Sequence, residues 1–374
     1  MFYSVIINRN CNFNCLYCYQ TDKKISSIKE KSIEQICNFI VDTAFKLCDY
    51  RICINISGGE CLLFPEKVKF FISSIRKHTK NNKLPDPIIE ISTNGSLLTE
   101  ELMSFIKSNE CSLYIGFDGL EKVQNINRIP LGDDITYQTY LNNLELLKSF
   151  NFKKNTITLN FVITSNNVGY VSENFSFLQK NFPEFRLSFN IAYNSIWDLY
   201  AIKKLKVELN KLADLYLKCI KKNKDFSINL FDRQINMILN ALKGCSIPRC
   251  SAGETSFGFT PEGDIIACGT CLGMKIEKQF IIGNIEEGIN EVQKNYFLKQ
   301  VDIAQKKSVC SKCAHEKKCY KYCPTVNYLA SGKLDEISTS LCDINKILID
   351  VSESLLNRLC KIDTTVVMSK YLRI

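Results

Sequence analysis

Short apolar runs alternate with longer amphipathic stretches through the first half of the chain. The runs are rich in β-branched residues, and they predict six strands: Ser4–Asn8, Ile52–Ser57, Ile88–Ser92, Ser112–Phe117, Thr156–Ile163 and Arg186–Ile191. The stretches between them predict helices near Lys31–Leu47, Glu66–His78, Thr99–Lys107, Thr136–Lys148 and Val168–Lys180. Such alternation favours βαβ units and a parallel sheet. Because a closed barrel of this kind needs eight strands, we expect an α/β fold built as an open, partial (β/α)6 TIM-like barrel.

The pattern changes towards the C-terminus. One more long helix is predicted at Ile202–Lys221, and after Lys243 loops rich in Cys, Gly and Pro replace regular elements. A hairpin is expected among them, with strands Ser256–Thr260 and Ile265–Cys268 around a Pro-Glu-Gly-Asp turn. The segment Cys310–Cys342 has little apolar periodicity, so it buries little core. It therefore needs another source of stability, such as disulfides or bound metal.

A final amphipathic helix is predicted at Ile344–Leu359. The 374 residues are enough for a large domain and a smaller one. We therefore expect the barrel in residues 1–225, a loop-rich domain in 226–343 and a C-terminal helix in 344–374.

The 19 cysteines are the unusual feature of the composition. The N-terminus lacks the apolar segment of a signal peptide, and no apolar run approaches the roughly 18 residues that cross a bilayer. We therefore expect a cytoplasmic protein without a membrane partner, in which cysteines indicate metal rather than disulfides. Only two histidines are present, so the ligands must be thiolates, which suit zinc or iron–sulfur clusters.

The net charge of +9 leaves two interpretations open, a solvated lysine surface or attraction to an acidic partner. The lysines are scattered and form no arginine-rich or aromatic-interleaved stripe. We therefore expect no nucleic-acid partner.

Three cysteines directly follow the first predicted strand, in the order Cys11-x3-Cys15-x2-Cys18. Three thiolates in one short loop hold three irons of a [4Fe–4S] cube and leave the fourth open to a small chelating ligand. The alternative is a zinc knuckle whose fourth ligand lies elsewhere. With Tyr17 just before its third cysteine, the motif resembles the signature of the radical S-adenosylmethionine (SAM) superfamily.

The resemblance implies a SAM molecule chelated to the open iron and cleaved by an electron to a 5′-deoxyadenosyl radical. It also assigns SAM contacts at the ends of the next strands: Tyr17, Gly58, Gly59, Glu60, Thr93, Asn94, Asp118 and Arg128. The glycines would receive the amino group of SAM, Glu60 would fix their loop, and Arg128 would pair with the carboxylate. Taken singly, a Gly-Gly pair at a strand end usually just makes a turn, and a surface position is an equal alternative for Arg128. One departure stands out, because relatives often have Ser where this chain has Gly116, before Asp118.

The C-terminal cysteines match the pattern of the SPASM domain, an iron–sulfur domain of radical SAM enzymes that act on peptides and proteins. By resemblance, auxiliary cluster I is held by Cys245, Cys250, Cys268 and Cys323. Auxiliary cluster II is held by Cys310, Cys313, Cys319 and Cys342. The expected cofactors are therefore SAM and three [4Fe–4S] clusters, with two zinc sites as the alternative to the auxiliary pair. Without Cys245, cluster I would keep an open iron.

Cys271, just past Cys268, is a candidate hydrogen donor or acid, or an inert buried thiol. His315, inside the predicted cluster II loop, is expected to be structural.

The resemblance favours oxidative maturation of a ribosomal peptide or protein, with formation of a thioether or carbon–carbon crosslink. The first alternative is an anaerobic sulfatase maturase that makes formylglycine. That group places an aspartate base directly after the equivalent of Cys268, where this chain has Gly269. Further alternatives are a peptide epimerase using Cys271 and a non-catalytic iron–sulfur protein.

The expected partners are a peptide or protein substrate and a flavodoxin- or ferredoxin-type electron donor. Since the first cluster cysteine is residue 11, we expect any leader peptide to be recognised by a separate protein or by the basic surface.

Overall fold

The computed structural model describes residues 1–20, 26–132, 135–245, 250–271, 273–274, 277–305, 310–319 and 323–372. These residues form two compact units. Unit 1 comprises residues 1–117, 128–158 and 251–299, and unit 2 comprises residues 118–127, 159–250 and 300–374. The division into a barrel and a cysteine domain remains a prediction, since the units are defined by compactness.

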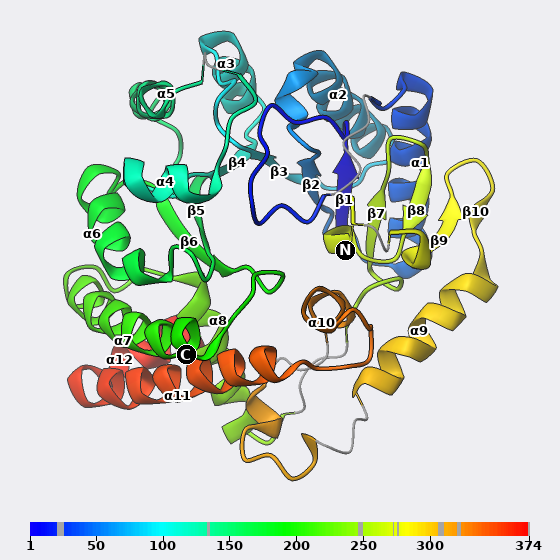
Figure 1. Ribbon diagram of the computed structural model, residues 1–374. Coiled ribbons are helices and arrows are strands. Elements are labelled where there is room, and N and C mark those ends of the chain that lie inside the picture. Colours follow the sequence, from blue (N-terminus) through cyan, green and yellow to red (C-terminus); the bar gives the residue numbers. More distant parts are fainter. Residues whose placement is uncertain are drawn as a thin grey trace. The chain divides into compact units, whose positions relative to one another are not determined.

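The sheet of unit 1 is centred on β1 (Phe2–Ile6). This strand pairs in parallel with β2 (Cys53–Ser57) on one side and with β7 (Ser256–Phe259) on the other (Figure 1). Beyond β2 follow β3 (Ile88–Thr93) and β4 (Ser112–Gly116), both parallel. The first four predicted strands are therefore confirmed, in the parallel arrangement expected of βαβ units.

The predicted hairpin is also confirmed, because β7 pairs antiparallel with β8 (Asp264–Ile266). Two further antiparallel strands, β9 (Ile281–Asn284) and β10 (Gly288–Ile289), extend it. The expectation that loops replace regular elements after Lys243 is therefore wrong in part. These strands are two to four residues long, too short to carry a period-two pattern.

Aromatic rings hold the hairpin on β1. The ring of Tyr3 stacks on those of Phe257 and Phe259 at centroid distances of 6.1 and 6.2 Å. Phe39 meets both phenylalanines edge-on at 5.6 and 5.4 Å. Aromatic pairs of this kind contribute about 0.5–1.5 kcal/mol each beyond the area they bury. The hairpin is therefore part of the core of unit 1.

The helices of unit 1 cover the stretches predicted for them, and one further helix, α9, was not predicted. They are α1 (Glu30–Leu47), α2 (Pro65–Asn81), α3 (Glu100–Ser108), α5 (Tyr137–Ser149) and α9 (Glu291–Gln305), whose last residues reach unit 2.

Unit 2 takes over the chain within β5 (Ile157–Ile163), between Thr158 and Leu159, and continues with β6 (Arg186–Ile191). Its helices are α4 (Glu121–Asn127), α6 (Val171–Asn181), α7 (Leu199–Lys222), α8 (Asn229–Leu242), α10 (Pro324–Ser331), α11 (Thr339–Ile362) and α12 (Thr364–Val367), followed by a turn at Met368–Leu372. Both predicted strands and the helices at α6, α7 and α11 are confirmed. In the described part of the chain, no helix combines the length and apolarity needed to span a bilayer.

Candidate active site

The loop after β1 brings together the three cysteines of the first motif. The Cys18 amide donates to the Cys15 carbonyl at 3.0 Å, which tightens the loop. Burial, then the charges of Glu60 and of the Cys15 and Cys18 thiols, raise the pKa of the Cys11 thiol to about 12. Groups that repel one another in this way are neutralised by a shared cation, and a metal deprotonates the thiols it binds. Three such thiols fit the protein ligands of a [4Fe–4S] cluster with one open iron.

The Gly58-Gly59 pair lies against the backbone that leads into this loop. The amides of Gly59 and Glu60 donate to the carbonyls of Asn8 and Asn10 at 3.0 and 2.8 Å. A Cβ on Gly59 would lie 2.1 Å from the Asn10 carbonyl oxygen, and one on Gly58 would lie 2.6 Å from that of Asn8. Only glycine allows these two segments to approach so closely.

Glu60 joins the Gly-Gly loop to the end of β3. It is buried, and its carboxylate accepts hydrogen bonds from the Thr93 hydroxyl at 2.7 Å and the Asn94 amide at 2.6 Å. It also accepts from the Leu62 amide at 3.0 Å. Burial raises the pKa of Glu60, and these hydrogen bonds oppose the rise. The carboxylate therefore ties its own loop to the end of β3, while its part in SAM binding stays a prediction.

Asn94, at the end of β3, is hydrogen-bonded to the cysteine loop. Its side-chain amide donates to the Asn12 side chain at 2.7 Å, and Asn12 donates to the Ser96 hydroxyl at 2.9 Å. The three motifs are thus held together by hydrogen bonds.

Arg128 lies between Tyr17 and the end of β4. Its guanidinium carbon is 5.4 Å from the Tyr17 ring centroid, within cation–π range. A Cβ on Gly116 would lie 2.5 Å from Nη1 of Arg128. The structure therefore brings together two predicted SAM contacts, and the departure at Gly116 lies beside them.

Asp118 belongs to unit 2. It is buried, its amide donates to the Gln124 side chain at 2.7 Å, and its Oδ1 accepts from the Val162 amide at 3.2 Å. Its contact with SAM remains a prediction, while its observed bonds join it to α4 and β5 within unit 2.

A second loop of unit 1, which contains Cys268 and Cys271, lies against the residues after Cys18. The hydroxyl of Tyr19 lies beside Cys18, Cys271 and Cys268, and burial followed by these three charges raises the pKa of Tyr19 to about 12. Gln20 donates to the Gly58 carbonyl at 2.9 Å. Cys271 itself is completely buried, in a turn where its amide donates to the Cys268 carbonyl.

The predicted ligands of cluster II all lie in unit 2. Cys310 and Cys313 share a tight turn, with the Cys313 amide 3.0 Å from the Cys310 carbonyl. Cys342 lies in the first turn of α11, and its thiol, followed by the carboxylate of Asp343 and the thiol of Cys313, raises the pKa of Lys346. An ammonium group therefore lies near two predicted ligands, where it would offset the negative charge of a four-thiolate cluster.

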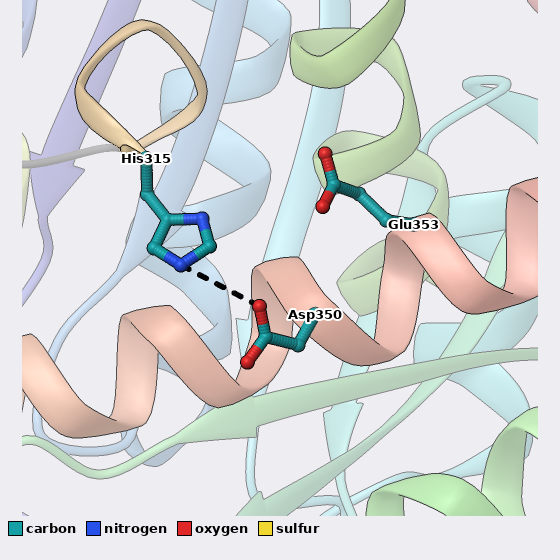
Figure 2. A group of neighbouring side chains, drawn as sticks. All are labelled: His315, Asp350 and Glu353. Carbon is teal, nitrogen blue, oxygen red and sulfur yellow. Dashed lines mark ion pairs between the residues drawn. The ribbon is translucent and has the colours of Figure 1, made fainter. Parts of the chain in front are cut away.

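Ion pairs anchor the predicted cluster II loop on α11. Figure 2 shows His315 pointing from the loop to Asp350 of α11, and Nε2 lies 3.5 Å from the Asp350 carboxylate. Lys318 pairs with Glu353 one turn further along. The donor atoms of His315, Asp350 and Glu353 lie within 4.8 Å of one another, as in a metal site. Because Lys318 already supplies a cation to Glu353, we interpret the group as an anchor, as expected for His315.

The predicted ligands of cluster I are divided between the units. Cys245, at the C-terminal end of α8, Cys250 and Cys323 belong to unit 2, whereas Cys268 belongs to unit 1. This ligand set therefore stays a prediction. Tyr193, after β6, has Cys323 and Cys319 as neighbours, and burial is the main cause that raises its pKa to about 12.

Sequence reasoning missed Tyr19, Gln20, Tyr193 and the partner of Arg9. Tyr19 and Gln20 directly follow Cys18, so their place in the chain was a usable signal. Tyr193 and the ion pair of Arg9 with Glu262 depend on contacts far apart in sequence and had no local signal.

Known proteins resemble this chain in sequence. Residues 5–176 match the sequence model of the Radical SAM superfamily. The chain is 26% identical over 294 residues to a cysteine-type anaerobic sulfatase-maturating enzyme of Clostridium novyi (strain NT), covering 74% of each chain. It is 22% identical over 362 residues to the radical SAM cyclopropyl synthase TigE of Paramaledivibacter caminithermalis, covering 92% of this chain and 72% of that one.

Two solved structures share the fold. Native anSMEcpe with bound AdoMet and Cp18Cys peptide has a TM-score of 0.76 at 20% identity, covering 96% of this chain and 98% of that one. Streptococcus suis SuiB bound to precursor peptide SuiA has a TM-score of 0.62 at 15% identity, covering 91% and 75%. At these identities the likeness concerns the fold alone, and it confirms the predicted fold class, a parallel α/β sheet followed by a C-terminal domain.

Proposed function

The chain is a member of the radical SAM superfamily, and from this premise we propose that it oxidises a ribosomal peptide or protein and crosslinks two of its residues. The bond formed would be a thioether or a carbon–carbon bond. The superfamily's cofactors are SAM and a [4Fe–4S] cluster, and SAM bound there supplies a 5′-deoxyadenosyl radical. The relatives include sulfatase-maturating enzymes, and structures of the same fold are known with bound peptides, which supports a peptide substrate.

The observation that carries the proposal is the set of hydrogen bonds that joins the cysteine loop, the Gly-Gly loop and the end of β3 around three thiols. The cysteine loop holds the Gly-Gly loop, Glu60 holds Thr93 and Asn94, and Asn94 holds Asn12. This arrangement supports the orientation of a ligand at an open iron, a task that a metal-crosslinked binding protein would not have.

The direction of the chemistry follows from stoichiometry. A crosslink removes two hydrogen atoms from the substrate: one is abstracted as an atom, and the other leaves as a proton and an electron. The electron needs an acceptor, and the eight C-terminal cysteines match two auxiliary [4Fe–4S] clusters, for a total of three. A flavodoxin- or ferredoxin-type protein would supply the electron that starts each cycle.

Gly269 supports crosslinking over formylglycine formation. In sulfatase maturases the resemblance places an aspartate base at this position. Here a Cβ would lie 2.0 Å from the Ser4 hydroxyl oxygen and 2.4 Å from its Cβ. Any side chain at 269 would therefore collide with β1. Complete burial of Cys271 likewise disfavours an epimerase, in which a thiol must reach the substrate.

The test is anaerobic reconstitution followed by assays of iron, SAM cleavage and product mass. We expect about twelve irons per chain, as three cubes of four, and release of 5′-deoxyadenosine with dithionite. Replacing Cys11, Cys15 and Cys18 with alanine should remove about a third of the iron and abolish SAM cleavage. Retained SAM cleavage in that variant, or stoichiometric zinc in the parent protein, would overturn the proposal. With a candidate peptide, loss of two hydrogen atoms indicates a crosslink, and an aldehyde product indicates formylglycine.

A further inference from the structure

Gly116 ends β4 in a backbone conformation open to any residue, since it is not among the glycines with positive φ. The need for glycine is therefore one of space. A Cβ at 116 would lie 2.5, 2.8 and 3.0 Å from Nη1, Nη2 and Cζ of Arg128. These are three atoms of one guanidinium plane, so the head of Arg128 occupies the place of the missing side chain.

The backbone just after Arg128 is tied to the cysteine loop, so the main chain that carries this side chain is held in place. The Asn14 amide donates to the Ile129 carbonyl at 2.7 Å, and the Leu131 amide donates to the Asn12 carbonyl at 2.8 Å. The residue is 6% exposed, and its guanidinium carbon lies 5.4 Å from the Tyr17 ring centroid. The main chain is thus held to the loop that presents the three thiols, and burial leaves the guanidinium little room to move.

We propose that Gly116 is a positioning residue that seats the Arg128 guanidinium towards the SAM carboxylate. A planar guanidinium binds a carboxylate through two parallel hydrogen bonds, so its orientation decides how well it does so. On this account, glycine in place of serine removes a hydroxyl group and leaves its space to the Arg128 guanidinium. A side chain at 116 and this pose of Arg128 exclude each other. The inference rests on the SAM-binding part of the proposed function and is independent of the substrate.

The two interpretations of Gly116 predict opposite changes in SAM affinity when the residue is replaced. If the position merely lacks a hydroxyl contact, Gly116→Ser should strengthen SAM binding. If it seats Arg128, both Gly116→Ser and Gly116→Ala should weaken SAM binding roughly ten- to a hundredfold, the cost of disturbing a charge-assisted hydrogen bond. Anaerobic equilibrium dialysis of SAM against reconstituted protein measures this, with the electron paramagnetic resonance spectrum of the SAM-bound cluster as a second readout.

Gly169→Ala is the matched control. There a Cβ would also meet the head of a cationic side chain, 2.5 Å from Nζ of Lys204, but that lysine is exposed and can move. We expect unchanged SAM affinity for this variant. Equal iron content in all variants shows that the cluster has assembled, and Gly116→Ala with Arg128→Lys, whose head is smaller, should recover part of the affinity.

An Arg128→Met background isolates the mechanism. There Gly116→Ala should cost nothing further, because the residue it positions is gone. Undiminished binding by Gly116→Ser, or a full additional loss in the Arg128→Met background, overturns the inference. Absence of SAM binding in the parent protein would instead reject the proposed function.

Discussion

Gly58, Gly59 and Gly269 share one feature, because another segment occupies the place where each Cβ would be. For the first two, the obstacle is the backbone around Asn8 and Asn10, so no side chain can move aside. For Gly269 it is Ser4, a residue on a central strand. Substitution at any of the three must therefore shift the backbone around the cysteine loop or β1.

Gly269→Asp tests whether the sulfatase-maturase base can be restored. We expect no formylglycine from a cysteine-containing sulfatase peptide, assayed by mass spectrometry. We also expect a loss of about 1–3 kcal/mol in the free energy of unfolding of the iron-free protein, as is typical of overpacking.

Ser4→Gly in the Gly269→Asp background is the control for space, since it removes the colliding hydroxyl and Cβ. We expect it to regain most of the lost stability. If Gly269→Asp alone is as stable as the parent protein and makes formylglycine, the steric argument fails.

The grouping of single residues was predictable where they belong to one known motif. Cys11, Cys15, Cys18 and Glu60 belong to motifs whose spacing is local, and the structure places them together. The hydroxyl of Tyr19 was not predictable, because two of its neighbours, Cys268 and Cys271, lie about 250 residues away in the chain. Spacing in sequence carries no information on such pairs.

At the scale of elements, length decided only part of what the sequence revealed. The six predicted strands and the helices predicted with them are present, because each carries several turns or alternations of pattern. The helices α4 and α10, of seven and eight residues, and the strands β9 and β10 were missed. Two longer helices, α8 and α9, of 14 and 15 residues, were missed as well. The parallel pairing of β7 with β1 was also missed, since the choice of strand partner depends on the whole sheet.

An ion pair links the β7–β8 turn to the cysteine loop. Nε of Arg9 lies 3.1 and 3.2 Å from the two carboxylate oxygens of Glu262, and Nη2 lies 2.8 Å from one of them. The Arg9 side chain is 8% exposed and that of Glu262 is 46% exposed. Burial raises the pKa of Glu262, but the hydrogen bonds and charge of Arg9 outweigh this and lower it. Because the pKa is lowered, the stabilisation is present above the ordinary carboxyl pKa and is lost only as pH falls through the lowered value.

Glu262→Gln should therefore weaken the cysteine loop at neutral pH. We expect a loss of about 1–2 kcal/mol in the free energy of unfolding, moderate because Glu262 is half exposed. We also expect lower iron occupancy at the first cluster after reconstitution. Glu286→Gln is the control. Glu286 lies in the turn between β9 and β10 and pairs with Lys31 of α1, and both side chains are exposed, Glu286 at 63% and Lys31 at 77%. Equal iron content and stability in the two variants would refute a positioning role for the pair.

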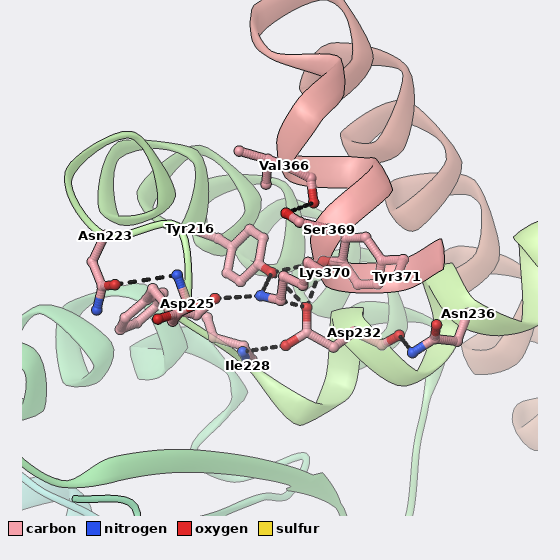
Figure 3. Close-up of polar contacts among 11 residues, drawn as sticks. Tyr216, Asn223, Asp225, Ile228, Asp232, Asn236, Val366, Ser369, Lys370 and Tyr371 are labelled. Carbon is pink, nitrogen blue, oxygen red and sulfur yellow. Dashed lines mark hydrogen bonds and ion pairs between the residues drawn. The ribbon is translucent and has the colours of Figure 1, made fainter. Parts of the chain in front are cut away.

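At the scale of the whole chain, Lys370 and Tyr371 near the C-terminus hold helix α8. Figure 3 shows Lys370 and Tyr371 gathered with Tyr216 around the carboxylate of Asp232, in the first turn of α8. Oδ1 of Asp232 accepts from the hydroxyls of Tyr216 and Tyr371 at 2.5 and 2.6 Å and lies 3.1 Å from the Lys370 ammonium. Burial and the charge of Asp232 raise the pKa of both tyrosines, and burial lowers the pKa of Lys370. The sequence predicted the long helix that precedes Lys370 and Tyr371. It did not predict the contact of Tyr371 with Asp232, which are 139 residues apart.

The helix held in this way also supports the predicted cluster II loop. Two residues after Asp232, the side chain of Gln234 donates to the Lys318 carbonyl at 2.7 Å. Loss of the C-terminal contacts should therefore reach the loop through α8. The double substitution Lys370→Met and Tyr371→Phe keeps the shape of both side chains and removes their polar groups. It leaves the largely buried carboxylate of Asp232 without its ammonium partner.

We expect this double variant to lose about 3 kcal/mol in the free energy of unfolding of the iron-free protein, the usual cost of breaking a buried ion pair. After reconstitution we expect less iron at cluster II, with 5′-deoxyadenosine release retained because the first cluster lies in unit 1. Adding Asp232→Asn should restore part of the stability by removing the isolated charge. Lys361→Met, at an exposed position near the end of α11, should change neither quantity. If the double variant keeps its full iron content despite its lower stability, the C-terminal residues hold α8 without supporting the loop, and the path through Gln234 is wrong.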